Sequence, residues 1–233
     1  MERVRRRPSG QSGFTLIELL SGMMIGLIVL MAAFTLIDHA TSASEAIANR
    51  QDAVQRGRMA MERVTRQLRS QVCLGEETEP ITAGDANSVT FFADLSDGSK
   101  NVQQRVLTFS PTAKTITEQS WPGVGTYPQL TFPGPPNPPN VLLRQAQQVT
   151  VNGVPQPIFR FFAFKVGGVA GDMEELPVPL SPTDASRTIM VKVSFVALPD
   201  RIRPKDLEST TFFSDVYVRL ADPTKPAEGP RCL

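Results

Sequence analysis

Histidine and cysteine are scarce in this chain of 233 residues, which has one histidine, His39, and two cysteines, Cys73 and Cys232. Metal sites commonly draw several ligands from these two residue types, so most such sites are excluded, as is chemistry that needs two histidines. His39 stands just after a long apolar segment and has no cysteine near it in sequence, which fits an interfacial polar residue better than a catalytic base. We therefore expect no enzyme, no catalytic residue, no metal site and no cofactor.

Proline is missing between Pro8 and Pro80, whereas 19 of the 20 prolines lie from Pro80 onward, so the two parts of the chain are built differently. Hydrophobic residues make up 41% and charged residues 20% of the chain, which excludes a disordered polyelectrolyte and a membrane protein with several spans. The formal net charge of +1 gives the whole chain no general attraction to nucleic acid, and we expect none to bind directly.

Charge is absent from Leu19 to Ile37, and these 19 residues would span roughly 28 Å as a helix, close to the hydrocarbon thickness of a bilayer. The preceding residues 1–13 contain four arginines and one glutamate. A basic flank of this kind keeps the N-terminus on the cytoplasmic side, so the rest of the chain should face outward.

A single carboxylate, Glu18, lies just inside the apolar run, where a charged group is costly to bury and usually functional. Three interpretations compete: a secretory signal cut near residues 40–43, a permanent anchor, and a cut between Gly13 and Phe14. In the third, the new α-amine on Phe14 would lie about one helical turn from the Glu18 carboxylate. Between staggered neighbours, the amine of one subunit could neutralise Glu18 of the next.

The string from Ser12 to Leu20, SGFTLIELL, resembles the processing site of type IV pilins and type II secretion pseudopilins. The resemblance implies that a membrane aspartyl prepilin peptidase cuts after Gly13 and N-methylates Phe14, while Glu18 serves subunit recognition and assembly. The sequence departs from many major pilins at Thr35, where those proteins have a proline.

The resemblance also implies partners and a location. The partners are prepilin peptidase, other pilin or pseudopilin subunits, an inner-membrane assembly platform and, before assembly, membrane lipid. The chain would be a single-pass protein of the cytoplasmic membrane with its C-terminal domain extracytoplasmic, and would enter a filament later. No Walker motif occurs, so the ATP hydrolysis that drives assembly would belong to a partner.

Two later segments, residues 55–69 and 211–219, resemble J-type minor pseudopilins and PilW-type minor pilins. The expected function is therefore a structural minor subunit of a type IV pilus or type II secretion pseudopilus, at or near the tip, where it initiates assembly. The alternative is a membrane-anchored extracytoplasmic module for adhesion or for binding DNA or a substrate, outside any filament.

The sequence divides into a basic leader (1–13), a transmembrane or filament-core helix (14–37), an amphipathic continuation (38–75) and a β-rich head (76–233). Within the continuation, which we expect to stay helical to about Val72, apolar residues recur every seven positions and form one narrow packing face. These residues are Ile47, Val54, Met61 and Leu68.

The head favours short strands between proline and glycine clusters, which predicts an α+β pilin-like fold with an antiparallel sheet laid on the helix. The predicted strands are Ser88–Leu95, Arg105–Phe109, Thr115–Gln119, Val141–Val151, Ile158–Val166, Thr188–Leu198 and Thr211–Leu220. Residues 121–140 and 167–175 are expected to be loops. Acidic residues in two turns (Asp94 and Asp97; Asp172, Glu174 and Glu175) match no defined calcium loop, and we expect solvated turns there.

The two cysteines lie far apart in sequence, Cys73 near the end of the long helix and Cys232 next to the C-terminus. In an exported chain they favour a disulfide that ties the tail to the helix–sheet junction. Unpaired thiols and intermolecular bonds remain open alternatives.

Overall fold

The computed structural model describes residues 13–75, 78–94, 102–169, 171–200 and 210–218. The chain divides into two compact units, Met1–Ala48 and Asn49–Leu233, each of which is considered by itself below. The predicted leader lies outside the described residues, apart from Gly13.

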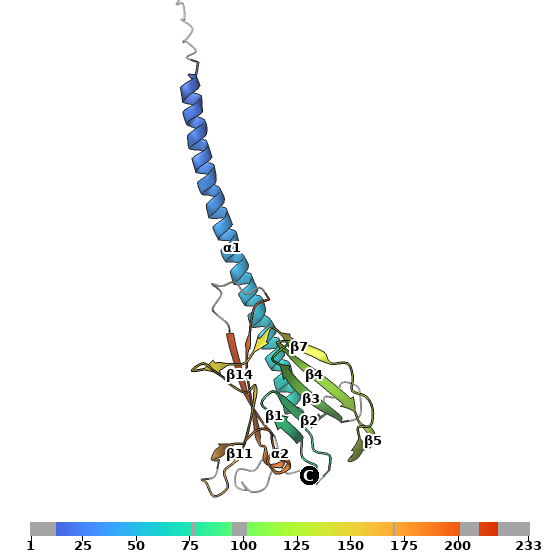
Figure 1. The fold of residues 1–233 in the computed structure, drawn as a ribbon. Helices are drawn as coiled ribbons and strands as arrows, with labels where there is room; N and C mark the ends of the chain where they lie inside the picture. The colour runs from blue at the N-terminus through green and yellow to red at the C-terminus, as the bar shows by residue number, and fades with distance from the viewer. Residues whose placement is uncertain (1–12, 76–77, 95–101, 170, 201–209, 219–233) are drawn as a thin grey trace, which may run out of the picture. The chain divides into compact units, whose positions relative to one another are not determined.

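One long helix, α1, runs from Leu16 to Arg69 and contains no proline (Figure 1). It ends where the chain begins to pair with a strand: Gln71 forms a β-bridge with Ala93, and the Val72 amide donates to the Phe92 carbonyl at 3.0 Å. The helix therefore stops before Val72, because the backbone of residues 71 and 72 is already bonded to the sheet.

The second unit contains two larger antiparallel sheets rather than the single sheet that we predicted. The first sheet has the strand order β1-β2-β3-β4-β7; these strands are Ile81–Asp85, Ser88–Ala93, Gln103–Ser110, Thr115–Pro122 and Asn140–Arg144. The second sheet has the order β12-β11-β13-β14, and β8 also pairs with β13; its strands are β8 Ala146–Gln147, β11 Phe159–Phe164, β12 Met173–Glu175, β13 Met190–Ala197 and β14 Thr210–Tyr217. The α+β class is confirmed.

Two small hairpins and a short helix complete the described elements. The hairpins pair β5 (Val124–Thr126) with β6 (Gln129–Thr131), and β9 (Thr150–Val151) with β10 (Val154–Pro155). Helix α2 spans Pro182–Arg187 and is capped by Ser181, whose hydroxyl accepts the Asp184 amide at 3.1 Å.

The predicted strand Val141–Val151 is wrong, since the chain changes sheets within it. Residues before Gln145 pair with β4 of the first sheet, and residues after it pair with β13 of the second. Gln145 has φ of 55°, a left-handed conformation that breaks the extended run.

Two predicted loops contain regular structure. The segment 121–140 begins inside β4 and forms the β5–β6 hairpin, and residues 173–175 of the second loop form β12 against β11. Few apolar residues mark these segments, so their pairing could not be seen from hydrophobic pattern alone. The predicted strand alternation holds elsewhere: Ile189, Val191, Val193 and Phe195 are all buried.

The core of the second unit joins both sheets to the last part of α1. Met61 and Leu68 are buried in it as the heptad pattern predicts, whereas Val54 is only partly buried and Ile47 is exposed. The buried face instead begins with three small residues, Ala53, Gly57 and Ala60. At Gly57 an added Cβ would lie 2.3 Å from the Phe212 ring and 2.9 Å from Ala197 Cβ, so glycine permits the close approach of α1 to the second sheet.

Candidate functional site

The residues of the proposed processing motif lie together at the start of α1. Gly13 and Phe14 precede the helix, which begins at Leu16, and Glu18 lies in its first turn. The Phe14 side chain is 83% exposed and Glu18 is exposed as well. The structure thus leaves both the cleavage position and the carboxylate open to other molecules.

Thr15 caps the helix, a role that the sequence analysis missed. Its carbonyl accepts the Leu19 amide at 3.2 Å, and its hydroxyl oxygen lies 3.4 Å from the Glu18 amide nitrogen. Its hydroxyl also lies 3.4 Å from Glu18 Oε2, to which it can donate. The Thr-x-x-Glu spacing of a capping box was the signal that could have identified it.

The first turn of a helix is a favourable place for a carboxylate, because the unpaired amides there carry partial positive charge. Glu18 is the only ionisable side chain from Gly13 to Ile37. A positive charge on Phe14, at the same end of the helix, would add to this field. The local structure therefore places the Glu18 carboxylate close to the chain end that cleavage would create.

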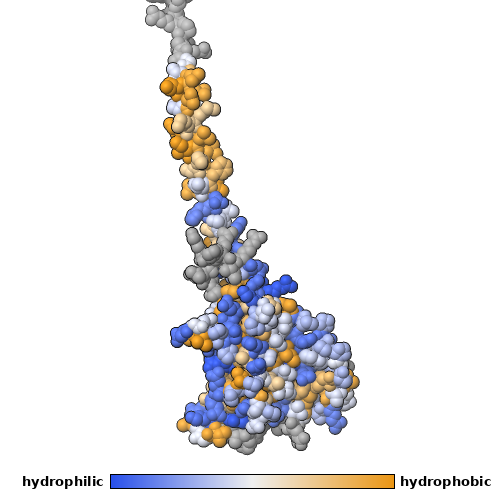
Figure 2. All heavy atoms as spheres, viewed as in Figure 1, coloured by the Kyte–Doolittle hydropathy of each residue, from blue (hydrophilic) through white to orange (hydrophobic). Residues whose placement is uncertain are grey.

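Downstream of Glu18, α1 presents apolar side chains that are exposed among the described residues. Figure 2 shows these hydrophobic residues gathered along the helix, and Leu27, Ile28 and Phe34 are each more than 60% exposed. By length and composition, α1 could cross a membrane. An exposed apolar surface of this kind is typical of a region that is buried in lipid or against the apolar helices of other subunits.

Hydroxyl side chains within this apolar run are satisfied by the helix itself. Ser21 donates to the Glu18 carbonyl at 3.0 Å, and Thr35 donates to the Ala32 carbonyl at 2.8 Å. The helix therefore continues without interruption at Thr35, the position where many major pilins have a proline. Glu18 remains the one polar side chain here whose full charge needs an external partner in lipid.

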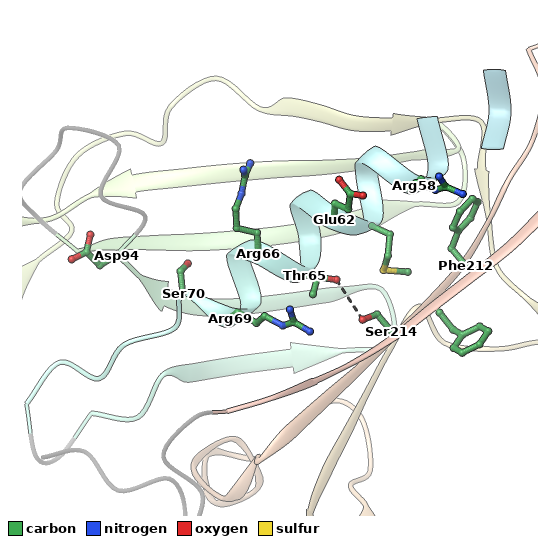
Figure 3. Close-up of a pocket in the computed structure, with 11 residues that line it drawn as sticks. Arg58, Glu62, Thr65, Arg66, Arg69, Ser70, Asp94, Phe212 and Ser214 are labelled. Atoms are coloured by element: carbon green, nitrogen blue, oxygen red, sulfur yellow. Dashed lines mark hydrogen bonds between the residues drawn. The ribbon is translucent and has the colours of Figure 1, made fainter. Parts of the chain in front are cut away.

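In the second unit, a groove of about 730 Å³ runs beside α1 and the strand β14 (Figure 3). Thr65 and Ser214 meet across it, with their hydroxyl oxygens 3.5 Å apart. Arginines from α1 and the aromatic rings of β14 line it; these are Arg58, Arg66, Arg69, Phe212 and Phe213. The segments that resemble minor pseudopilins and minor pilins thus meet at one surface.

Two of the acidic residues considered for calcium, Glu174 and Glu175, form ion pairs with arginines. Glu174 contacts Arg187 at 2.6 Å, and Glu175 forms a two-bond ion pair with Arg160. The hydrogen bonds from Arg160 lower the pKa of Glu175 below its usual value, although partial burial opposes this effect. Asp94 lies at the groove of Figure 3, and Asp97 lies outside the described residues.

The predicted disulfide joins one described and one undescribed residue. Cys73 is buried just after α1, and its carbonyl accepts the Tyr127 hydroxyl at 3.2 Å. Cys232 lies outside the described residues, so the pairing stays a prediction. His39 is exposed on α1.

A long helix with an acidic first turn and an uncovered apolar surface, followed by an α+β head, defines a pilin-like protein. The comparison with family models agrees: residues 8–37 match the prokaryotic N-terminal methylation motif. The chain therefore carries the features of a type IV pilin-like substrate of prepilin peptidase. No curated protein matches it.

Proposed function

We propose that this chain is a minor subunit of a type IV pilus or type II secretion pseudopilus that starts assembly at or near the tip. The observation that carries the proposal is the methylation motif at residues 8–37 on a helix whose apolar surface is uncovered. An exposed apolar helix next to a processing site is what a subunit needs if it waits in lipid and then packs among other helices.

The proposed sequence of events begins with insertion of the chain into the cytoplasmic membrane, with the arginine-rich leader inside. Prepilin peptidase cuts after Gly13 and methylates the Phe14 amine, which keeps its positive charge. The head is then extracytoplasmic, and the Cys73–Cys232 bond ties its tail to the end of the helix. In this scheme residues 14–37 form the membrane and filament-core part, residues 38–75 its continuation, and residues 76–233 the head.

During assembly, apolar helices leave the bilayer and pack against each other. We infer that Glu18 of one subunit then meets the Phe14 amine of a neighbour, so that each charge offsets the cost of burying the other. The same contact would fix how far each subunit is displaced along its neighbour. The assembly platform would supply the mechanical work.

A tip position is supported by the resemblance to minor subunits and by the size of the head, with its two larger sheets. The test is to place a small epitope tag after Gly134, where an added Cβ would meet nothing within 4 Å, and to label sheared filaments with gold. We expect at most one labelled site per filament, at its end, and few filaments when the gene is deleted.

Labels along the whole filament would contradict the tip position but not the processing. Absence of the processed chain from every filament fraction, with normal filament number after deletion, would favour the membrane-anchored binding module instead. The tag control is the same insertion in a chain with Gly13→Leu, which should remain in the membrane and label no filament.

A further inference from the structure

A second cavity in the second unit is lined by charged and polar side chains, as ligand-binding sites often are. The assembly steps proposed above do not use it. It encloses about 530 Å³ between the last turns of α1, the strands β3 and β4, and the proline-rich segment that precedes β7. This volume falls within the range of cavities that hold small molecules. Its lining is mainly polar, unlike the groove beside β14, which contains several apolar side chains.

The inner wall of the cavity contains a buried ion pair. The side chains of Arg105 on β3 and Glu118 on β4 are 6% and 7% exposed, and they contact each other directly. Arg105 Nη2 also donates to Gln103 Oε1 at 2.6 Å. The two charges largely cancel, so this pair provides a rigid polar wall rather than a net charge.

Two arginines of α1, Arg63 and Arg66, give the cavity its positive charge. Arg63 is half exposed, and its Nε lies 3.8 Å from the second oxygen of Glu118, which is beyond hydrogen-bond distance. Arg66 is exposed and makes no ion pair with any described residue. Three guanidinium groups thus line the cavity with one carboxylate, which leaves a formal excess of two positive charges.

Two buried hydrogen-bond acceptors in the lining, Gln67 Oε1 and Glu118 Oε2, have no hydrogen-bond partner among the described residues. Gln67 is 2% exposed, and its Oε1 atom is buried without a hydrogen bond to any described residue. Leaving a buried amide oxygen without a donor is energetically unfavourable, so a ligand that donates a hydrogen bond to it gains affinity.

The part of the wall next to Glu118 on β4 is held in place by its own hydrogen bonds. The Asn137 side chain donates to Ser120 Oγ at 3.0 Å, and the Asn137 amide donates to the Ser120 carbonyl at 2.8 Å. Asn140 stands nearby at the start of β7. The cavity therefore has fixed polar walls before any ligand arrives, which reduces the entropy lost on binding.

We propose that this cavity binds a small hydroxylated carboxylate, such as a sugar acid. The carboxylate lies against Arg63 and Arg66, whose guanidinium groups suit a planar anion. A hydroxyl group donates to Gln67 Oε1, and further hydroxyls meet the amide side chains of Asn137 and Asn140. Neither a neutral sugar nor a simple carboxylate satisfies both parts of the site.

The test uses the full-length protein in detergent and three probes at constant ionic strength: glucuronate, glucose and acetate. Titration calorimetry should give a saturable signal for glucuronate with an affinity at least tenfold higher than for glucose or acetate. Acetate imitates an acidic side chain of a neighbouring subunit, so equal binding of acetate and glucuronate would overturn the proposal. Absence of a saturable glucuronate signal would overturn it too.

Three variants locate the binding. Arg63→Gln combined with Arg66→Gln should weaken glucuronate binding at least tenfold, whereas Arg58→Gln combined with Arg69→Gln removes the same charge from the groove beside β14 and should leave it unchanged. Gln67→Leu should weaken glucuronate binding and leave the weak acetate signal as it is. Equal losses in both double variants would mean general charge attraction and would contradict the assigned site.

Discussion

The two units of this chain treat the same kinds of side chain in opposite ways. In the first unit Leu27 and Ile28 are 63% and 64% exposed, whereas in the second Leu68 and Ile189 are each 1% exposed. Full burial of one such side chain contributes roughly 1.5–3 kcal/mol. The second unit obtains this energy from its own sheets, whereas the exposed apolar side chains described in the first would obtain it from lipid or from other chains.

This difference suggests that residues of the first unit serve assembly, whereas core residues of the second unit serve folding. Changes in the first unit should alter processing and incorporation while the head stays folded. Changes in the core of the second unit should alter stability while the cleavage site stays intact. Each prediction below either sharpens this separation or would break it.

The largest effect is expected at the cleavage position. Gly13→Leu should abolish processing, because the resemblance to prepilins implies that the peptidase has no room for a side chain there. Immunoblots of membrane fractions should show only the longer chain. Ser12→Ala is the matched control and should be processed; normal processing of Gly13→Leu would show that the cut lies elsewhere.

The next effect concerns assembly without loss of processing. Glu18→Ala should be cut normally but should be missing from sheared filaments, because the Phe14 amine of a neighbour would then be buried without a partner. Ser21→Ala, which removes a hydroxyl bonded only to its own helix, should be incorporated normally. Normal incorporation of Glu18→Ala would remove the proposed role of this carboxylate.

A moderate effect is expected in the second unit. Gly57→Leu forces a side chain against Phe212 and Ala197 and should lower the free energy of unfolding by about 1–3 kcal/mol. Gly134→Ala, where nothing lies within 4 Å of the added Cβ, should change little. Urea denaturation of the detergent-solubilised chain measures both. Loss of processing in Gly57→Leu would break the separation of the two units.

The smallest effect is a pH dependence from the ion pair between Arg160 and Glu175. The hydrogen bond from Arg160 lowers the pKa of Glu175 in the folded head, so its stabilisation is present above the unfolded pKa and is lost as pH falls through the folded pKa. Both side chains are at least a third exposed, so solvent screening keeps the contribution under about 1 kcal/mol.

The matching comparison is between the native chain and Arg160→Gln. Their unfolding free energies should differ slightly at pH 7, and the difference should shrink as the pH falls below the usual glutamate value of 4.5. A difference that grows on acidification would contradict the assigned direction of the pKa shift.

Sequence alone predicted the parts of the molecule that depend on strong local patterns. The long helix, the position of Glu18 and the alternation in Ile189–Phe195 follow from apolar runs and periodicity. The face of α1 that packs on the head was only half predicted, because Ala53, Gly57 and Ala60 are too small to mark a hydrophobic stripe. At Gly57, the close approach of Phe212 and Ala197 from the second sheet explains the burial.

Other features depend on partners that lie far away in the chain. The change of sheet at Gln145 joins strands that are distant in sequence, and no local signal specifies their pairing. The cavity beside Glu118 likewise combines residues from α1, two strands and a proline-rich segment. Thr15 is different, since its capping pattern was present in the sequence and was overlooked.

The measurement that tests the account most directly is the intact mass of the native chain extracted from its membrane. Processing by prepilin peptidase predicts a polypeptide that begins at Phe14 and carries one added methyl group. A chain that retains Met1–Gly13, or one that begins beyond Ala43, would contradict it.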